Sequence, residues 1–526
     1  MLIYSDKVFQ NPVHVVKAFD NEEFKNAFAE LEILKEKYYL VGYVRYETYK
    51  IFQNIAITSK EPLLYFEAYR DYSAFETAPL AHHKTYTYPK VSREEYFANI
   101  DYIKEQIALG NTYEVNYTFP NAVWTSNFGI DLYMSLISEQ KTPYNAYIKN
   151  EFEEVLSFSP ELFFKVSDGK IFTKPMKGTI GRGADEIEDK ANREFLQNDE
   201  KNRAENVMIV DLLRNDLGRI AKTGTVKVDK LFEIETHKTL HQMTSEISAE
   251  LVDDVGLYQI FEAIYPCGSI TGAPKVSTMK IIEDVEPEPR GIYCGTIGII
   301  HGSECEFSVP IRILQRKTDE PYYTCHTGGA IVWDSTAQEE WEEALLKSSF
   351  LKTQLLPVDT MAVKNGKILF EKEHRERLNV PVTPKTSEEI IRIVGDEVQH
   401  LPLKPLTTNI VKIAKTSTDS ANPLLKVKTD FRPWYAETME KIRRGEVFDE
   451  IYFNERGELT EGARSNIIIE KNGEYFTPPV ECGLLNGIYR RSLNSEEKIL
   501  YKEDLLEADA IYCCNSVRGL VKVCLL

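Results

Sequence analysis

The stretch KPMKGTIGRG, from Lys174 to Gly183, follows a segment in which apolar and polar residues alternate around a D-G pair. That segment, SPELFFKVSDGKIFT, predicts a β-hairpin that leads into a further strand. Lys177 would lie at the end of this strand, next to Gly178. A lysine in this position can point into a cleft, where a depressed pKa would make its amine a nucleophile. The alternative is an ordinary solvated lysine.

The composition limits the class of protein. The 526 residues are enough for two or three domains, and 43% hydrophobic with 28% charged residues indicates a globular chain. The net charge of −19 argues against nucleic acid or an anionic membrane as a partner. The N-terminal residues show no signal-peptide pattern, and no apolar run reaches the roughly 18 residues of a membrane span. The eight cysteines begin at Cys267 and include no CxxC pair. We therefore expect a cytoplasmic protein with reduced thiols.

Two segments place glutamates on expected helices. Glu205 lies in DEKNRAENVMIVDLLRNDLGRI, and Glu340, Glu343 and Lys347 lie in DSTAQEEWEEALLKS. The apolar face expected beside Glu205 consists of Ala204, Val207, Met208, Ile209 and Leu212. The spacing i, i+3 and i+7 puts the last three residues of the second segment on one helix face. Mg²⁺ prefers a few carboxylates, waters and an anionic substrate group, which two such helices would offer. Because the segments are far apart in the chain, their spacing does not establish this site, and solvated glutamates are the alternative.

These stretches resemble the chorismate-utilising enzymes, a family that includes anthranilate synthase, isochorismate synthase and aminodeoxychorismate synthase component I. The resemblance covers roughly Tyr96 to Leu351 and rests on SPELFF, PMKGTIGRG, DEKNRAENVMIVDLLRNDLGRI, GSITGAPK, RGIYCGTIG, VPIRI and TGGAIVWDS. It implies an α+β fold, with a large two-layer chorismate-binding domain built of antiparallel sheets. Anthranilate synthases usually carry a small residue at the position of Lys177, so the lysine resembles aminodeoxychorismate synthase. The family commonly has Gln in a YQVN-like pattern where this chain has Glu114, so a polar contact to substrate or effector differs here.

The resemblance also implies roles for the residues in these motifs. Lys177 would attack C2 of chorismate while Glu161 protonates the hydroxyl that leaves C4. Glu161 must hold its proton at neutral pH for that task, so we expect it to be partly desolvated. Glu205 and Glu343 would hold Mg²⁺, with Glu340 nearby. The residues implied at the substrate are Thr271, Tyr293, Arg312, Gly328, Gly329, Lys347 and His241. A buried structural histidine is the alternative for His241.

The sequence pattern changes at Leu356-Pro357, and we predict two domains, 1–356 and 357–526. The second resembles the class IV pyridoxal-phosphate enzymes, among them aminodeoxychorismate lyase, through EHRERL, LKVKTDFRPWY, FNERGELTEGARSNIII and TPPVECGLLNGIYRR. This implies a smaller α/β domain of fold type IV. Lys428 takes the place of the Schiff-base lysine, after Val427 instead of the usual histidine, and Glu461 takes the place of the carboxylate that pairs with the pyridinium nitrogen. The residues implied to bind the phosphate group are Arg377, Gly487, Ile488, Tyr489, Asn515 and Ser516.

The two resemblances together imply consecutive steps of 4-aminobenzoate synthesis, on the way to folate. The first would convert chorismate and ammonia to 4-amino-4-deoxychorismate, and the second would cleave that product to 4-aminobenzoate and pyruvate. Because the chain has no glutaminase signature with a nucleophilic cysteine, a separate glutamine amidotransferase subunit would supply the ammonia. We also expect a homodimer formed through the C-terminal domain.

Three alternatives stay open at this point. The segment between Arg377 and Lys428 is shorter than the small subdomain usual in class IV enzymes, which is compatible with a C-terminal domain that has no catalytic activity. The second alternative is anthranilate synthase component I fused to an aminotransferase. The third is a protein that binds chorismate without turning it over.

Overall fold

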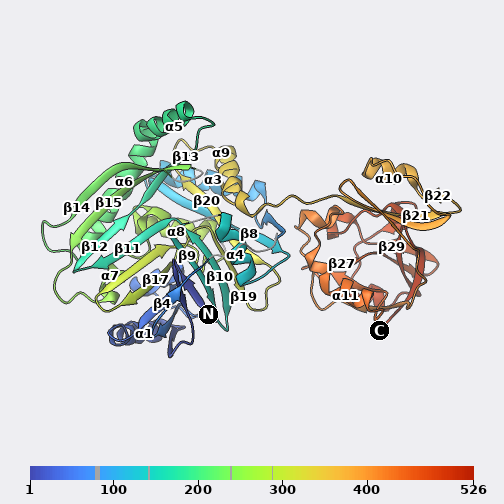
Figure 1. Ribbon diagram of the computed structural model, residues 1–526, viewed down its shortest axis with the longest axis horizontal. Helices are drawn as coiled ribbons and strands as arrows, with labels where there is room; N and C mark the ends of the chain where they lie inside the picture. Colours follow the sequence, from blue (N-terminus) through green and yellow to red (C-terminus); the bar gives the residue numbers. More distant parts are fainter. Residues whose placement is uncertain (77–82, 140–141, 237–239, 287) are drawn as a thin grey trace. The chain divides into compact units, whose positions relative to one another are not determined.

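The computed structural model describes residues 1–76, 83–139, 142–236, 240–286 and 288–526. These residues form two compact units, Met1–Lys352 and Thr353–Leu526 (Figure 1). The first unit ends a few residues before the domain boundary expected from the sequence.

Two large antiparallel sheets form the first unit. In one, the strand order is β16 (Gly272–Ala273), β8 (Glu114–Thr125), β20 (Tyr323–Ile331), β19 (Ile313–Lys317), β10 (Glu153–Ser159), β9 (Tyr144–Lys149), β1 (Leu2–Tyr4), β2 (Lys7–Phe9) and β6 (Ser73–Ala74), with β7 (Thr85–Pro89) also paired to β8. In the other, it is β13 (Met176–Gly181), β15 (Leu240–Glu250), β12 (Lys170–Lys174), β11 (Glu161–Ser167), β18 (Glu304–Val309), β17 (Thr296–His301), β4 (Tyr39–Val44), β5 (Leu64–Tyr69) and β3 (His14–Ala18), with β14 (Lys227–Thr236) also paired to β15.

The two sheets share one apolar core. Tyr4 and Val155 from the first sheet belong to the same buried cluster as Val41 and Phe307 from the second. The longer helices of this unit are α1 (Asn21–Leu34), α3 (Arg93–Ala108), α4 (Ile130–Glu139), α5 (Glu186–Asn198), α6 (Glu200–Gly218), α7 (Leu257–Ile264), α8 (Lys275–Val285) and α9 (Ala337–Lys347), and the one-turn helix α2 spans Tyr49–Phe52. Burying apolar side chains between the sheets supplies the main driving force for this arrangement.

Local sequence signals explain where many of these elements begin and turn. The side chains of Asp20, Ser92 and Thr336 accept hydrogen bonds from the first free amides of α1, α3 and α9. The expected D-G turn joins β11 to β12, and both Asp168 and Gly169 have positive φ, as a two-residue hairpin of this type requires.

The buried face of helix α6 only partly matches the expected one: Ile209 is buried as expected, and Met208 and Leu212 are half-buried. It packs against β13 and β15 (Figure 1), and Asn206, Ile209, Val210 and Leu213 lie on the buried side. Ala204 and Val207, expected on the apolar face, are exposed. The expectation was wrong for Ala204 and Val207 because the buried face includes a polar residue, Asn206, whose Oδ1 accepts a hydrogen bond of 2.6 Å from Ser245 of β15.

The second unit contains two further sheets. The smaller has the order β22 (Lys367–Ile368), β21 (Val358–Lys364), β23 (Glu388–Val394) and β24 (Glu397–Leu401). The larger has the order β27 (Leu459–Gly462), β26 (Asp449–Phe453), β25 (Ile410–Ile413), β32 (Gly519–Leu525), β31 (Ala510–Asn515), β28 (Asn466–Lys471), β29 (Glu474–Thr477) and β30 (Glu496–Glu497). Because β27 also pairs with β28, the larger sheet curls back on itself. The helices are α10 (Glu371–Arg377), α11 (Ala436–Arg443), α12 (Ile488–Arg491) and α13 (Lys502–Leu506). Across the described part of the chain, no helix is both long and apolar enough to span a membrane.

Candidate active sites

Lys177 lies on β13 beside an irregularity in the strand. The pairing of β13 with β15 shifts register between Met176 and Thr179, and a shift of this kind re-aims the side chains within it. The Lys177 side chain is 10% exposed, and its Nζ lies 2.6 Å from Oε1 of Glu114 at the start of β8. Glu114 is fully buried, so the two residues form a buried ion pair.

This pair decides the charge state of Lys177. Burial lowers the pKa of Lys177, but the Glu114 carboxylate raises it more, with further contributions from Glu205 and Glu161, and the net pKa lies above that of an ordinary lysine. The prediction that Lys177 has a depressed pKa was therefore wrong. The expectation considered the desolvation of the lysine and did not include a carboxylate held against it.

Glu161 is the first residue of β11 and is buried as expected. Burial raises its pKa to about 7, although a hydrogen bond from Ser269 and the charge of Lys177 both act to lower it. Ser269 Oγ donates to Glu161 Oε1 at 2.6 Å. A carboxyl group with this pKa keeps much of its proton at neutral pH, which is what a general acid needs.

The GSITGAPK segment contacts both Glu161 and Glu114. Ser269 contacts Glu161, and four residues later Ala273 pairs with Glu114 between β16 and β8. Gly272 has a φ of +141°, and a Cβ at this position would lie 1.9 Å from the carbonyl oxygen of Glu114. Only glycine allows so close an approach of the two backbones.

A second acidic group surrounds Gly329 of β20. A Cβ on Gly329 would lie 3.1 Å from Glu340 Oε2, 3.6 Å from Lys347 Nζ and 3.7 Å from Glu343 Oε1. Lys347 Nζ also contacts Glu343 Oε1 at 2.8 Å and donates to the carbonyl oxygen of Gly328 at 2.7 Å. Thus Glu340, Glu343, Lys347 and both glycines, which the sequence predicted to act together, lie together.

Glu205 of α6 is electrostatically linked to both acidic groups. Burial raises the pKa of Glu205, Lys177 lowers it, and the carboxylates of Glu114 and Glu340 raise it. Within the described ranges, however, no three His, Cys, Asp or Glu side chains converge closely enough to hold a metal ion. The structure therefore shows two carboxylates facing one space at Gly329, with Glu205 as a neighbouring charge.

Arg312 provides a cationic group with which none of the described residues forms an ion pair. It is half-buried and has a φ of +54°, a strained backbone conformation for a residue other than glycine. Burial lowers its pKa, and among the described residues no carboxylate offsets that effect. A desolvated guanidinium in this state favours an anionic ligand.

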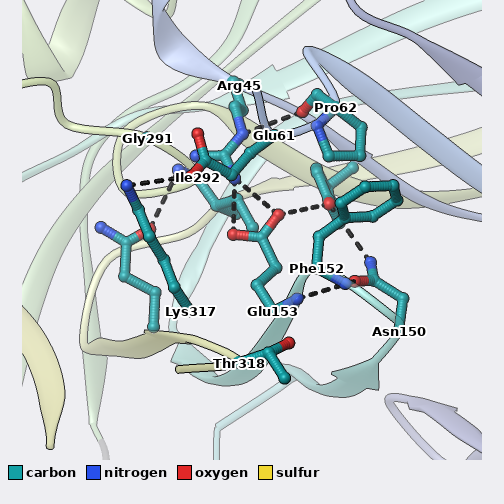
Figure 2. A network of polar contacts seen from close by, with 12 residues as sticks. Arg45, Glu61, Pro62, Asn150, Phe152, Glu153, Gly291, Ile292, Lys317 and Thr318 are labelled. Carbon is teal, nitrogen blue, oxygen red and sulfur yellow. Dashed lines mark hydrogen bonds and ion pairs between the residues drawn. The ribbon is translucent and has the colours of Figure 1, made fainter. Parts of the chain in front are cut away.

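A polar network fixes the backbone that leads to Tyr293. Arg45 Nη2 contacts both carboxylate oxygens of Glu153 at 2.6 Å (Figure 2). Tyr43 also donates a hydrogen bond to Glu153. A Cβ on Gly291 would lie 2.9 Å from Arg45 Nη1, so the arginine packs against a glycine turn with a φ of +70°. Tyr293 follows this turn, and its buried ring stacks on His326 with centroids 5.0 Å apart.

The remaining predicted substrate residues have their polar atoms engaged by the protein. Thr271 Oγ1 donates to the carbonyl oxygens of Cys267 and Gly268 at 3.2 Å each. Both ring nitrogens of His241 lie 3.0 Å from a protein oxygen, Nδ1 from Thr236 Oγ1 and Nε2 from Asp189 Oδ1. This arrangement favours the structural alternative for His241.

In the second unit, Lys428 lies beside β21 of the smaller sheet. Its carbonyl oxygen accepts a hydrogen bond from Val358 at 2.8 Å, which brings Asp359 close. Burial lowers the pKa of Lys428 to about 8; Asp359 raises it, and three arginines, Arg377, Arg432 and Arg392, lower it. The surroundings thus lower the pKa of Lys428, a shift opposite in direction to that at Lys177.

Glu461 of β27 is buried and held from several sides. Oε1 accepts hydrogen bonds from Arg432 Nη2 at 2.7 Å and Tyr435 at 3.2 Å, and Oε2 accepts one from the amide of Leu485 at 3.1 Å. Burial raises its pKa, whereas Arg432 lowers it. The role implied for Glu461 needs a fixed, buried carboxylate, which is what the structure contains.

Arg377 links the predicted phosphate-binding residues to Asp359. Its Nη1 lies 3.4 Å from Asp359 Oδ1, and Nη2 lies 3.5 Å from the carbonyl oxygen of Asn486, next to Gly487, Ile488 and Tyr489. Ser516 donates to the carbonyl oxygen of Thr360 at 3.1 Å, so it also neighbours β21. Asn515 is occupied by its own turn, accepting from the amides of Val517 and Arg518.

The chain matches two family models. A model described as chorismate binding enzyme matches residues 74–353, more than half of the chain, and one described as amino-transferase class IV matches residues 394–526. The chain belongs to the chorismate binding enzyme family. The predicted resemblance, and the predicted order of an α+β chorismate-binding domain followed by a class IV domain, are confirmed.

The chain is also similar to individual curated proteins. It is 37% identical to aminodeoxychorismate synthase component 1 of Klebsiella aerogenes over 53% of this chain and 62% of that protein, and 37% identical to the same component of Escherichia coli (strain K12) over 50% and 58%. It therefore spans about 60% of the length of these curated relatives. Anthranilate synthase component I from Streptococcus pneumoniae TIGR4 superposes with a TM-score of 0.58 at 22% identity, covering 67% of this chain and 92% of that one, which supports the fold.

Several contacts of this chorismate binding enzyme were missed in the sequence. Glu114 was noted as an unusual residue, but its pairing with Lys177 was not foreseen, since 63 positions separate them. Ser269 was visible in GSITGAPK without a role. Asp359 and Arg432 carried no signal beyond lying near the predicted motifs.

Proposed function

We propose that the first unit aminates chorismate at C4 and forms 4-amino-4-deoxychorismate. The observation that carries the proposal is the buried pairing of Lys177 with Glu114, beside a Glu161 carboxyl whose pKa is about 7. A lysine amine and a protonated carboxyl in one water-poor site are a nucleophile and a general acid. The curated relatives named aminodeoxychorismate synthase component 1 support the same activity.

In this proposal each charged group acts at one part of the substrate. The Lys177 amine attacks C2 of the ring, and Glu161 gives its proton to the hydroxyl that leaves C4 as water. Ammonia then adds at C4 and the lysine leaves C2. Arg312 binds a carboxylate of chorismate, since its guanidinium is desolvated and offset by no acid among the described residues.

Mg²⁺ fits the acidic group at Gly329. Glu340 Oε2 and Glu343 Oε1 face one space, and Mg²⁺ is commonly held by one or two carboxylates together with waters and a substrate anion. Glu340 and Glu343 would hold the ion, and Glu205 would complete the acidic surroundings. A bound Mg²⁺ would supply positive charge beside the second carboxylate of chorismate.

We further propose that the second unit cleaves 4-amino-4-deoxychorismate to 4-aminobenzoate and pyruvate with pyridoxal phosphate. Its residues fit this cofactor: Lys428 has a depressed pKa, Glu461 is a buried carboxylate, and Arg377, Arg392 and Arg432 surround the site with positive charge. The bound cofactor would supply an electron sink. Lys428 takes the proton from C4 of the substrate, and Arg377 with the Gly487–Tyr489 backbone binds the phosphate group.

We also propose where the ammonia comes from and in which pathway and compartment the protein acts. A separate glutamine amidotransferase subunit provides ammonia, and the two reactions belong to folate biosynthesis in the cytoplasm. A homodimer through the second unit also remains part of the proposal.

Product analysis tests the function. The purified chain is incubated with chorismate, Mg²⁺ and ammonium, with and without pyridoxal phosphate, and the products are identified by mass and chromatography. We expect 4-amino-4-deoxychorismate without the cofactor, and 4-aminobenzoate with pyruvate when it is added. Anthranilate would show amination at C2 and would contradict the proposal. Accumulation of 4-amino-4-deoxychorismate in both samples would favour a second unit without lyase activity.

A further inference from the structure

Glu114 has one carboxylate oxygen that no group in the described structure satisfies. Oε1 contacts Lys177 Nζ at 2.6 Å, whereas Oε2 is buried and without a hydrogen-bond partner among the described residues. A buried acceptor left unsatisfied is costly, so native structures retain few of them without a reason. An amide, which the resemblance leads us to expect here, could bond to a lysine but could not take a proton from it.

The position of Glu114 is rigid. Its backbone pairs with Ala273, its carbonyl oxygen accepts a hydrogen bond from Thr112 at 3.0 Å, and Gly272 packs directly against that carbonyl. The carboxylate is therefore held at Lys177 from a fixed strand end, and the contact does not depend on a mobile side chain reaching in from a loop.

Among the described residues, the charges that act most strongly on Lys177 are carboxylates, whereas Lys201 acts on two of the neighbouring acids, Glu205 and Glu343. Glu114 lies on β8, Glu161 on β11 and Glu205 on α6. The charge of Lys177 also lowers the pKa of Glu343 on α9. Together they keep Lys177 as an ammonium ion in the resting site. An ammonium ion has no lone pair, so the nucleophile of the proposed reaction must first lose a proton.

We infer that Glu114 is the proton acceptor that activates Lys177, and that it returns the same proton when the lysine is released. This inference rests on the proposed amination. It assigns a catalytic role to Glu114, because its carboxylate touches the reacting nitrogen.

The protons that are taken up and released balance over one turnover. A Lys177 N–H bond breaks and a Glu114 O–H bond forms, which leaves a neutral amine and a carboxylic acid in place of a buried ion pair. Loss of both charges is least costly in a water-poor site, where each ion is poorly solvated. The amine bonds to C2 while Glu161 protonates the departing hydroxyl. Ammonia adds at C4 and yields its excess proton to Glu161. The released Lys177 amine then recovers its proton from Glu114.

The test measures the first half of the reaction, with ammonia left out. The wild-type chain and the Glu114→Gln variant are mixed with chorismate and Mg²⁺ between about pH 6 and pH 9, and the reaction is stopped rapidly. Mass spectrometry then gives the rate at which the Lys177 peptide gains chorismate less one water. Glu114→Asp keeps a carboxylate and serves as the conservative variant.

The expected pH profiles differ in shape. In the wild type the rate falls only as Glu161 loses its proton, around pH 7, because the lysine proton moves within the site. In Glu114→Gln the rate also rises with pH at the acid end, since the proton must leave to water, so the profile becomes bell-shaped and its maximum is lower by about 10²-fold. Glu114→Asp should keep the wild-type shape at a reduced rate.

A matched control separates this role from the loss of any buried ion pair. Asp216→Asn removes the carboxylate that lies 2.5 Å from Lys275 Nζ, and it should leave the shape of the profile unchanged. If Glu114→Gln forms the adduct at the wild-type rate and with the wild-type profile, Glu114 is not the acceptor, although the proposed amination stands. If the wild type aminates chorismate yet never forms the adduct, the nucleophilic role of Lys177 and the role of Glu114 both fail.

Discussion

Each unit contains a lysine removed from water, yet the pKa values of the two lysines shift in opposite directions. Lys177 is paired with Glu114, and its pKa lies above that of an ordinary lysine. Burial and the charges of three arginines lower the pKa of Lys428 to about 8, although Asp359 acts to raise it. Burial alone does not determine what a lysine does; the sign of the neighbouring charge does. This contrast is the central claim of our account.

Lys177→Ala should show the largest effect. It removes the proposed nucleophile, so amination of chorismate should fall by at least about 10³-fold while chorismate binding persists. Steady-state product formation and equilibrium binding measure the two quantities. Lys174→Ala, three residues earlier and paired with Glu235 at a half-exposed site, is the control and should stay close to wild type. Unchanged turnover in Lys177→Ala would refute the nucleophile.

Lys428→Ala should abolish the covalent attachment of pyridoxal phosphate to the second unit. Without this amine the second unit cannot bond covalently to pyridoxal phosphate, so borohydride reduction should attach no cofactor to the chain. Mass spectrometry of the reduced protein measures it, and amination by the first unit should be unaffected. Lys426→Ala, an exposed lysine two residues earlier, should still take up the cofactor. Equal labelling of Lys428→Ala and wild type would show that another amine binds it.

Arg312→Gln should weaken substrate binding more than turnover. The guanidinium is expected to bind a carboxylate of chorismate, so its loss should raise KM by about 10- to 100-fold with a smaller change in kcat. Initial rates over a range of chorismate concentrations separate the two. A fall confined to kcat would mean that Arg312 does not bind the ground-state substrate.

The alkaline limb of the pH profile of amination should show the smallest change. Glu161 acts in its protonated form, so amination should fall as pH rises through about 7 when free ammonia is held constant. The hydrogen bond from Ser269 lowers the pKa of Glu161, and Ser269→Ala should move this fall to higher pH by roughly one unit. A shift to lower pH in the variant would contradict the assigned direction.

Much of the fold could be predicted from the sequence because its signals are local. The alternation of SPELFFKVSDGKIFT and its D-G pair predicted the β11–β12 hairpin, and both turn residues have the expected positive φ. The helix with Glu340, Glu343 and Lys347 was predicted from spacing, and these side chains do share one face near Gly329.

The charge states of the site could not be predicted in the same way. The pKa of Lys177 depends on Glu114, and the two residues lie 63 positions apart on strands of different sheets, β13 and β8. Nor does spacing reveal that Asn206 belongs to the buried face of α6, since its partner Ser245 lies on another strand. Such contacts form between elements far apart in the sequence, where periodicity carries no information.

The most direct test of the contrast is to titrate both lysines in one sample. The wild-type chain, free of added cofactor, is reacted with a trace of an amine-specific acylating reagent at a series of pH values, and mass spectrometry follows the Lys177 and Lys428 peptides. The pH midpoint of each curve is compared, so differences in access do not matter. We predict a midpoint near 8 for Lys428 and a midpoint above that of an ordinary lysine for Lys177. A midpoint for Lys177 equal to or below that of Lys428 would contradict the account.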